Sequence, residues 1–296
     1  MNDSIVKALA EIKQLEGVVP DSWQNLPWEE DEFSRFFLEN EELDDSVTCN
    51  EIEFLQNVLS SVNTLPLLGR ILDAGCGGGR TLKALSGKLG CDVAYTGIDI
   101  ALPPLKTAVE RIVAAQSSKT FAKGAVKKPY SVEFLKGQMT TMPFKNTVFD
   151  CVLSLFASWL SLSKCCFERF LSEAFRVLKD GSVLVLEAPS YESLMALDRD
   201  QSWSLAESSF AGNFKQLILS ENIVCDKKEI YIRKDYVVNL STGKLKKYCQ
   251  FYNLYRPDFL ASLLENAGFS TVTTFGDFDC SVPDDDSPRL IIVAYK

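Results

Sequence analysis

Short apolar runs alternate with helical stripes of apolar residues through the middle of the chain. Runs at 70–76, 94–100, 132–135, 149–155 and 182–188 predict buried strands. Between them, apolar residues recur every three or four positions, as in Leu82, Leu85 and Leu89, and predict helices. The last of these helical stripes begins at Phe167 and is expected to stop at Asp180-Gly181. Strands that alternate with helices indicate an α/β fold, with a parallel sheet covered by helices on both faces.

The pattern changes after residue 200. Extended stretches near 214–224, 229–240 and 245–255 are separated by turn residues and predict an antiparallel β meander. A helix is then expected from Pro257 to Gly268, followed by a final strand pair at 270–278 and 290–295.

The N-terminal 47 residues are acidic and rich in aromatic residues. Thr48 and Glu51 form a capping-box pattern, which predicts that a helix begins there. We therefore expect residues 1–47 to form an N-terminal helical cap segment and residues 48–296 to form one domain. Residues 200–255 would be an inserted β lid on that domain.

A glycine-rich turn follows the first strand of the α/β pattern, between Asp73 and Arg80. Such a turn at a helix N-terminus presents bare backbone N–H groups and the positive end of the helix dipole to a ligand. A dinucleotide fingerprint needs a third glycine where this chain has Arg80, so an NAD-dependent oxidoreductase is disfavoured. Read from Asp73, the pattern is D-x-G-x-G-x-G, which resembles motif I of class I S-adenosylmethionine (SAM) dependent methyltransferases.

This resemblance implies a Rossmann-like sheet, mostly parallel with an antiparallel last strand, and SAM as cofactor with S-adenosylhomocysteine as product. Asp99 ends the second strand about 20 residues after the turn, where ribose-binding carboxylates lie. Gly137–Phe144 matches the adenine frame of the family, but Gln138 stands where the family has Asp. The expected cofactor-binding residues are Asp73, Gly75, Cys76, Gly77, Gly79, Asp99, Ile100, Gln138, Met139 and Leu155.

The segment Phe149–Trp159 fits the fourth motif of the family, which faces the transferred methyl group. It lacks the (D/N)PP(Y/F) signature of many nucleic-acid and glutamine methyltransferases. Tyr255–Phe259, and the tail from Gly276 to Val293, are similar to the small-molecule subgroup of these enzymes. The resemblance therefore implies a methyltransferase (EC class 2.1.1) that modifies a small molecule in biosynthetic or secondary metabolism.

The chain contains no histidine, the side chain most often used as a base near neutral pH. This absence favours N- or C-methylation over O-methylation assisted by a histidine. Alternative bases are Asp277, Asp279, Tyr191 and Tyr255, although the two aspartates are also typical of a turn. Aromatic residues expected to line the acceptor pocket are Trp28, Phe156, Trp159, Trp203 and Tyr252, and packing in the core is the alternative for each.

A net charge of −9 disfavours nucleic acid as a partner. Nine cysteines without CxxC spacing predict neither a disulfide framework nor a metal site, and indicate a cytoplasmic protein. The acidic N-terminus has no signal-peptide pattern, and the apolar stretch 152–162 is too short to span a membrane. A monomer and a homodimer are both compatible with the sequence. A protein or RNA methyltransferase and a non-catalytic SAM-binding module remain alternative functions.

Overall fold

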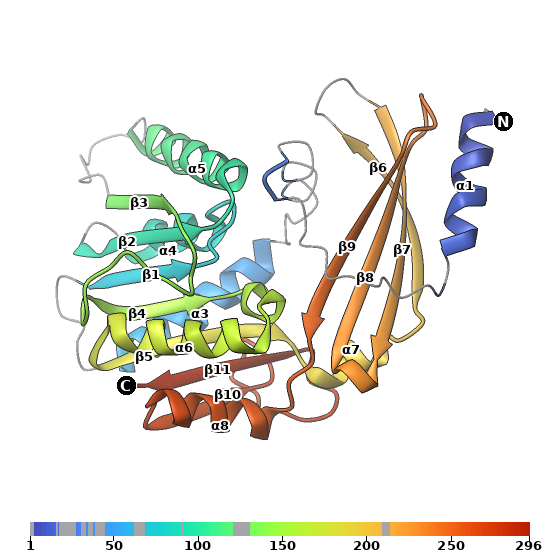
Figure 1. Cartoon of the computed structure of the whole chain (residues 1–296). Helices are drawn as coiled ribbons and strands as arrows, with labels where there is room; N and C mark the ends of the chain where they lie inside the picture. The colour runs from blue at the N-terminus through green and yellow to red at the C-terminus, as the bar shows by residue number, and fades with distance from the viewer. Residues whose placement is uncertain are drawn as a thin grey trace.

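Two β-sheets organise the computed structural model (Figure 1). The structure describes residues 3–15, 17, 28–30, 34, 38, 45–61, 69–89, 92–120, 131–208 and 214–296. Within these residues, one sheet has seven strands and the other has four.

The seven-stranded sheet has the order β10-β11-β5-β4-β1-β2-β3. Its strands are β1 (Arg70–Ala74), β2 (Ala94–Asp99), β3 (Ser131–Lys136), β4 (Phe149–Ser154), β5 (Leu178–Pro189), β10 (Thr271–Phe275) and β11 (Arg289–Tyr295). Strands β1 to β5 are parallel to one another, whereas β11 runs antiparallel to both β5 and β10. This mostly parallel sheet with an antiparallel last strand is the expected fold. Strand order reverses at β1 and β4, and ligands of open α/β sheets bind at such a point.

The central strands of this sheet are buried on both faces, and successive side chains of a strand point to opposite faces. Ile71, Leu153 and Val185 pack with helices α3 (Asp45–Ser61), α4 (Arg80–Leu89) and α5 (Leu102–Thr120) on one face. Their neighbours in sequence, Leu72, Val152 and Leu184, pack with α6 (Lys164–Val177) and α8 (Pro257–Ala267) on the other. The expected helices on both faces of the sheet are therefore present.

Two helix ends differ from the expectation. Helix α6 ends at Val177, and Leu178 already pairs with Phe149 of β4, so Asp180-Gly181 lies within β5 as a local irregularity. Strand pairing at Leu178 replaces the next helical turn. Helix α3 begins at Asp45, so Thr48 lies inside the helix, where its hydroxyl accepts a hydrogen bond from Arg80 instead of capping a terminus.

The second sheet has the order β6-β7-β8-β9 and is antiparallel throughout. Its strands are β6 (Gln201–Ser208), β7 (Phe214–Cys225), β8 (Ile230–Asn239) and β9 (Leu245–Asn253). The three expected strands of the meander are confirmed. Strand β6 was not expected, because its apolar residues Trp203 and Leu205 lie between polar ones and remain exposed.

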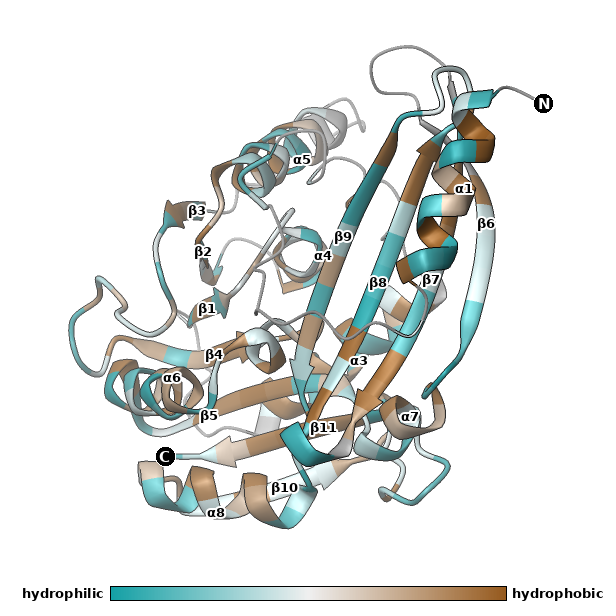
Figure 2. Cartoon of the chain, turned by 45° about the vertical axis from the view of Figure 1, so that its right-hand side comes forward, coloured by the Kyte–Doolittle hydropathy of each residue, from teal (hydrophilic) through white to brown (hydrophobic). Residues whose placement is uncertain are grey.

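The N-terminal helix α1 (Asp3–Leu15) packs on the second sheet (Figure 2). Glu11 pairs with Lys247 at 2.5 Å, and Lys234 donates to the carbonyl of Leu15 at 2.9 Å. Helix α1 lies on the side of the second sheet that faces away from the seven-stranded sheet (Figure 1). We call the α1 side the outer face and the opposite side the inner face.

Another part of the N-terminal segment lies at the seven-stranded sheet. The Glu29 carboxylate pairs with Lys136 at the end of β3, at 2.6 Å, and accepts from the backbone N–H of Leu102 at the start of α5. The cap segment therefore reaches both sheets. No described helix is long and apolar enough to cross a membrane.

Candidate active site

The glycine turn between β1 and α4 is the centre of the candidate site. Gly75, Gly77 and Gly79 have φ angles of 83°, 49° and 69°, in the left-handed region. A Cβ atom at Gly75 would lie 2.8 Å from the Cβ of Ser158, so no larger residue fits there. A Cβ at Gly77 would meet no described atom within 4 Å, so the backbone here borders open space. The turn thus leaves its backbone accessible to a ligand.

Asp99 ends β2 beside this turn. Its Oδ2 accepts from the backbone N–H of Gly77 at 2.9 Å, and its Oδ1 accepts from Ala101 at 2.9 Å. Burial raises the pKa of Asp99, while the N–H groups of Ala101 and Gly77 oppose that shift. Each carboxylate oxygen has a second lone pair, so the group can also accept from a pair of neighbouring hydroxyls.

Three charged side chains lie beneath the turn. Glu51 of α3 is fully buried and accepts from the Arg80 guanidinium at 2.5 Å and from the Thr81 hydroxyl at 2.9 Å. Asp73 is 3% exposed, and burial, followed by the negative charge of Glu51, raises its pKa to about 7. From the sequence alone, Arg80 argues only against a dinucleotide site, and Glu51 is expected only to cap a helix. Their pairing depends on how α3 packs against α4.

The raised pKa of Asp73 predicts that the protein loses stability as the pH rises. Between about pH 4 and 7 the folded chain keeps a proton on Asp73 that the unfolded chain has released. Raising the pH across this range should therefore lower the free energy of unfolding, by up to about 4 kcal/mol from this group. Asp73→Asn should flatten the dependence measured by urea unfolding at pH 5, 6, 7 and 8.

Glu133→Gln, which removes an exposed carboxyl on β3, serves as the control for this prediction. Asp99 and Glu187 also have pKa values raised by burial and should leave a smaller slope of the same sign in Asp73→Asn. Equal slopes in Asp73→Asn and the wild type would contradict the assignment.

The segment after β3 lies next to the glycine turn. Gly137 donates its backbone N–H to the carbonyl of Asp99 at 2.8 Å. The Met139 methyl group would lie 3.0 Å from a Cβ at Gly75, which places it against the turn. Gln138 is exposed, and Ile100 at the end of β2 is 56% exposed. The Gln138 amide oxygen accepts from the Thr140 hydroxyl at 3.5 Å and has a second lone pair. Apolar surface and an exposed amide are thus available for a flat aromatic ring beside the Asp99 carboxylate.

The segment after β4 forms the opposite wall. Leu155 is buried, and the Ser158 hydroxyl donates to the carbonyl of Gly75 at 3.2 Å. Phe156 is half-buried, with the Arg80 guanidinium carbon 4.2 Å from its ring centroid. Trp159, in contrast, is 1% exposed, stacks on Phe167 and donates its indole N–H to the carbonyl of Glu187 at 3.0 Å. Trp159 therefore packs in the core, as the alternative interpretation allowed.

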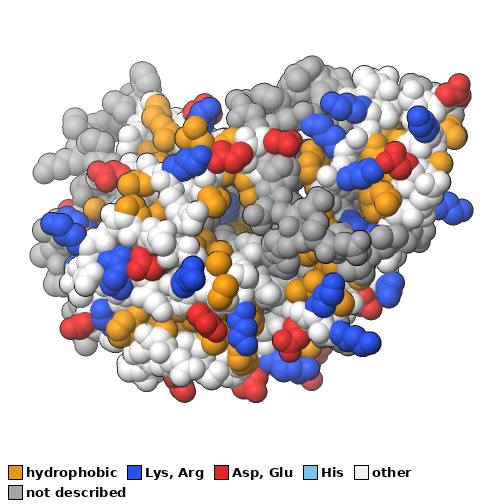
Figure 3. All heavy atoms as spheres, in the orientation of Figure 1, with side chains coloured by type: hydrophobic (Ala, Val, Ile, Leu, Met, Phe, Trp, Pro, Cys, Tyr) orange, Lys and Arg blue, Asp and Glu red, His pale blue; other side chains and the backbone are white. Residues whose placement is uncertain are grey.

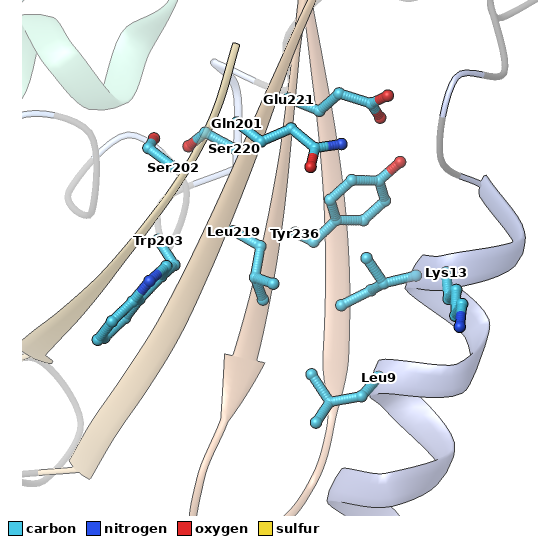
Figure 4. A pocket seen from close by; sticks show the side chains of 10 residues that line it. Leu9, Lys13, Gln201, Ser202, Trp203, Leu219, Ser220, Glu221 and Tyr236 are labelled. Carbon is cyan, nitrogen blue, oxygen red and sulfur yellow. The ribbon is translucent and has the colours of Figure 1, made fainter. Parts of the chain in front are cut away.

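The structure places the other aromatic candidates apart from one another. Trp28 is half-buried and its carbonyl accepts from the Ser34 hydroxyl. Tyr252 stacks on Tyr231 on the inner face of the second sheet. Trp203 is 72% exposed on the outer face, where it lines a cavity of about 370 Å³ under α1 with Leu9 and Tyr236 (Figure 4). The glycine turn is not among the residues that line this cavity.

Three of the four candidate bases accept hydrogen bonds from other residues, whereas Tyr255 has no such contact within the part of the chain that the structure describes. Asp277 accepts from Arg289 and from the N–H of Phe278, and Asp279 accepts from Ser281, which is the geometry of a turn. The Tyr191 hydroxyl accepts from Arg256. The Tyr255 hydroxyl is buried without a hydrogen-bond partner among the described residues, and burial raises the pKa of Tyr255. Burial likewise raises the pKa of the Cys76 thiol in the glycine turn.

The described surface carries charges of both signs. Lys and Arg side chains are interspersed with Asp and Glu over the face in Figure 3, without a continuous basic patch. The described part of the chain holds no group of three or more Cys, Asp or Glu side chains that could bind a metal ion.

Comparisons with known proteins connect this geometry to a family. Residues 72–186, which contain the glycine turn, Asp99 and the segment after β4, match the family described as "Methyltransferase domain". Residues 72–186 thus resemble a methyltransferase domain. Among curated proteins, the uncharacterised protein MJ1252 of Methanocaldococcus jannaschii is 29% identical over 70% of this chain and 63% of its own length. The chain thus matches less than two thirds of that relative.

Solved structures share the fold of the methyltransferase domain and of the sequence around it. A SAM-dependent methyltransferase from Clostridium acetobutylicum has a TM-score of 0.68 at 13% identity, covering 90% of this chain and 98% of the other. The sugar N-methyltransferase KedS8 from Streptoalloteichus sp. has a TM-score of 0.65 at 16% identity, covering 95% and 96%.

Proposed function

We propose that this protein binds SAM and transfers the sulfonium methyl group to a small-molecule acceptor, releasing S-adenosylhomocysteine. The observation that carries the proposal is the Asp99 carboxylate, hydrogen-bonded to Gly77 beside a glycine turn that borders open space. In this arrangement Asp99 would accept from both ribose hydroxyls. Ile100 and Met139 would pack on the adenine ring, and Gln138 would accept from the adenine amino group.

The methionine part of SAM would lie between the glycine turn and the segment after β4. Gly75 and Gly77 would border it on one side, and Leu155 and Phe156 on the other. An aromatic ring next to a sulfonium is a favourable cation–π arrangement. Bound SAM supplies an activated methyl group, and this chain's residues would align it with the acceptor and exclude water.

The acceptor would bind between this site and the inner face of the second sheet. Asn253 at the end of β9 donates to the carbonyl of Leu160 at 3.0 Å, which joins the sheet to the segment after β4. Along β9, the distance from Asn253 to Gln250 is about 10 Å. Gln250, Tyr252 and Arg233 lie on the inner face, so the proposed lid of residues 200–255 would present polar side chains to the acceptor. We also propose that residues 1–47 form a cap segment and that residues 48–296 form one domain.

We infer further that the acceptor atom is nitrogen or an already nucleophilic carbon. No histidine is available, and the carboxylates of Asp277 and Asp279 are held in turn contacts. An amine that loses its proton to water needs no base from the protein. The fold shared with KedS8, which is a sugar N-methyltransferase, supports a small polar acceptor of this kind.

The proposal is tested by incubating the purified protein with deuteromethyl-SAM and a metabolite extract, followed by mass spectrometry. The expected result is a small molecule that carries a trideuteromethyl group bonded to nitrogen or carbon. Gly77→Ala, which should not bind SAM, serves as the unlabelled control. Label found in protein or RNA instead would contradict the small-molecule proposal. SAM binding without any labelled product would identify a non-catalytic binding module.

A further inference from the structure

The turn after β4 has an unusual backbone. Phe156 and Ala157 both have a φ angle of 56°, in the left-handed region that residues other than glycine rarely adopt. Two such residues in succession persist only where surrounding contacts hold them, and such strain is often found at functional sites. The contacts that hold this turn are therefore of interest, because the turn forms one wall of the candidate site.

Glu187, near the end of β5, makes most of these contacts. Its Oε2 accepts from the backbone N–H of Phe156 at 2.7 Å. Its backbone carbonyl accepts from the N–H of Ala157 at 3.1 Å and from the indole of Trp159 at 3.0 Å. One residue thus fixes both left-handed positions and the side chain beyond them.

The buried charge of Glu187 is balanced from β11. Glu187 is 2% exposed, and its Oε1 accepts from Arg289 at 3.2 Å. Arg289 also donates to Asp277 at 3.0 Å, and its guanidinium lies 5.2 Å from the ring centroid of Phe278. The C-terminal Gly-Asp-Phe-Asp and Asp-Ser-Pro-Arg motifs, to which the proposed chemistry gives no role, therefore hold Arg289 against Glu187.

The Phe156 side chain is held from the other side. The Arg80 guanidinium carbon lies 4.2 Å from the ring centroid, and Arg80 is fixed by the buried Glu51. Two ion pairs from different parts of the domain, Glu51–Arg80 and Glu187–Arg289, thus converge on one residue. One pair holds its ring and the other its backbone.

We propose that Glu187 is a positioning residue of the methyl-transfer site. Its carboxylate, balanced by Arg289, holds the Phe156–Ala157 turn against the glycine turn and thereby sets the affinity for SAM. This inference rests on the proposed function for its ligand, but the backbone geometry that Glu187 controls can be measured without any ligand. Glu187 acts through Phe156 and need not touch SAM or the acceptor.

The test compares Glu187→Gln with a matched control, Asp150→Asn. Asp150 is also a buried carboxylate that accepts from a backbone N–H, that of Arg70 at 2.8 Å, and pairs with a cation, Lys179. It lies at the start of β4, away from the turn at the end of that strand. The two variants should therefore lower the melting temperature by similar amounts. A difference between them in other measurements then does not come from a general loss of stability.

Two further measurements separate the variants. In Glu187→Gln, amide hydrogen exchange of the peptide containing Phe156 and Ala157 should be faster by about tenfold, because a charge-assisted hydrogen bond is lost. The dissociation constant for SAM, measured by calorimetry, should rise by about tenfold or more. In Asp150→Asn, both quantities should stay within about twofold of the wild type.

Unchanged exchange at Phe156 and Ala157 in Glu187→Gln, or an equal change in Asp150→Asn, overturns the proposal. If the wild type does not bind SAM, the proposed function fails, whereas the exchange measurement still decides the role of Glu187. If Glu187→Gln does not fold, Arg289→Met replaces it, since it removes the balancing charge and should accelerate the same amides. If both single variants fold, the double variant Glu187→Gln/Arg289→Met should be less impaired than the sum of the single changes, and additive effects contradict the coupling.

Discussion

Replacing Gly77 by alanine should abolish SAM binding while leaving the protein folded. A Cβ at this position meets no described atom within 4 Å, so the folded chain accommodates it without a clash. The φ angle of 49° should cost about 1–2 kcal/mol for a residue with a side chain. A ligand that packs on the backbone of Gly77, however, would meet the new methyl group. We expect the SAM dissociation constant from calorimetry to rise at least about a hundredfold, or about 2.7 kcal/mol.

Gly181 provides the matched control for this change. It has a φ angle of 77°, a Cβ there would likewise meet no described atom within 4 Å, and it lies within β5 beside the C-terminal Lys296. Gly181→Ala should therefore lower the free energy of unfolding by a similar amount and leave SAM binding unchanged. Equal SAM affinity in the two variants would mean that the glycine turn does not contact the cofactor.

The second large effect is expected at Asp99. Asp99→Ala removes the acceptor proposed for both ribose hydroxyls, and each charge-assisted hydrogen bond contributes about 1.5–3 kcal/mol. It also removes the acceptor of the Gly77 N–H, which helps to shape the turn. We expect a loss of SAM affinity of at least about a hundredfold. Asp99→Asn, which keeps one acceptor oxygen, should lie between Asp99→Ala and the wild type.

Two controls distinguish the loss of a ribose contact from the effect of removing a negative charge. Glu110→Gln on the exposed surface of α5 makes the same charge change without affecting the site, and should bind SAM like the wild type. Deoxy analogues of S-adenosylhomocysteine that lack a ribose hydroxyl should lose affinity for the wild type, but much less for Asp99→Ala. An undiminished penalty in the variant would show that another residue holds the ribose.

The sequence predicted the elements whose formation depends on local pattern. Apolar runs predicted the strands from β1 to β5, because strands buried on both faces, such as β4, are mostly apolar. Local signals were weaker where two elements compete for the same residues. Leu178 fits the apolar stripe of α6, but pairing with Phe149 of β4 places it in β5. Strand β6 has little apolar pattern and is specified by its pairing with β7.

The candidate site likewise has a part that local sequence patterns predicted and a part that they did not. Its glycines and Asp99 follow one another within a single strand–turn–helix–strand unit, so their spacing alone brings them together, and their relation to the family could be seen in the sequence. The ion pairs that converge on Phe156 join residues 29 and 102 positions apart, Glu51 with Arg80 and Glu187 with Arg289. No local pattern relates such distant partners.

The sequence by itself thus determined the class of fold and the expected place of the cofactor. The fold class depends on periodicity, and the expected cofactor site depends on glycines and an aspartate that lie close together in the chain. Only the tertiary structure decided which aromatic side chains remain accessible. It placed Trp159 in the core, Trp203 on the outer face and Phe156 at the candidate site. The physical reason is that burial and charge pairing are properties of packed elements, and strands and helices distant in sequence meet only after the chain has folded.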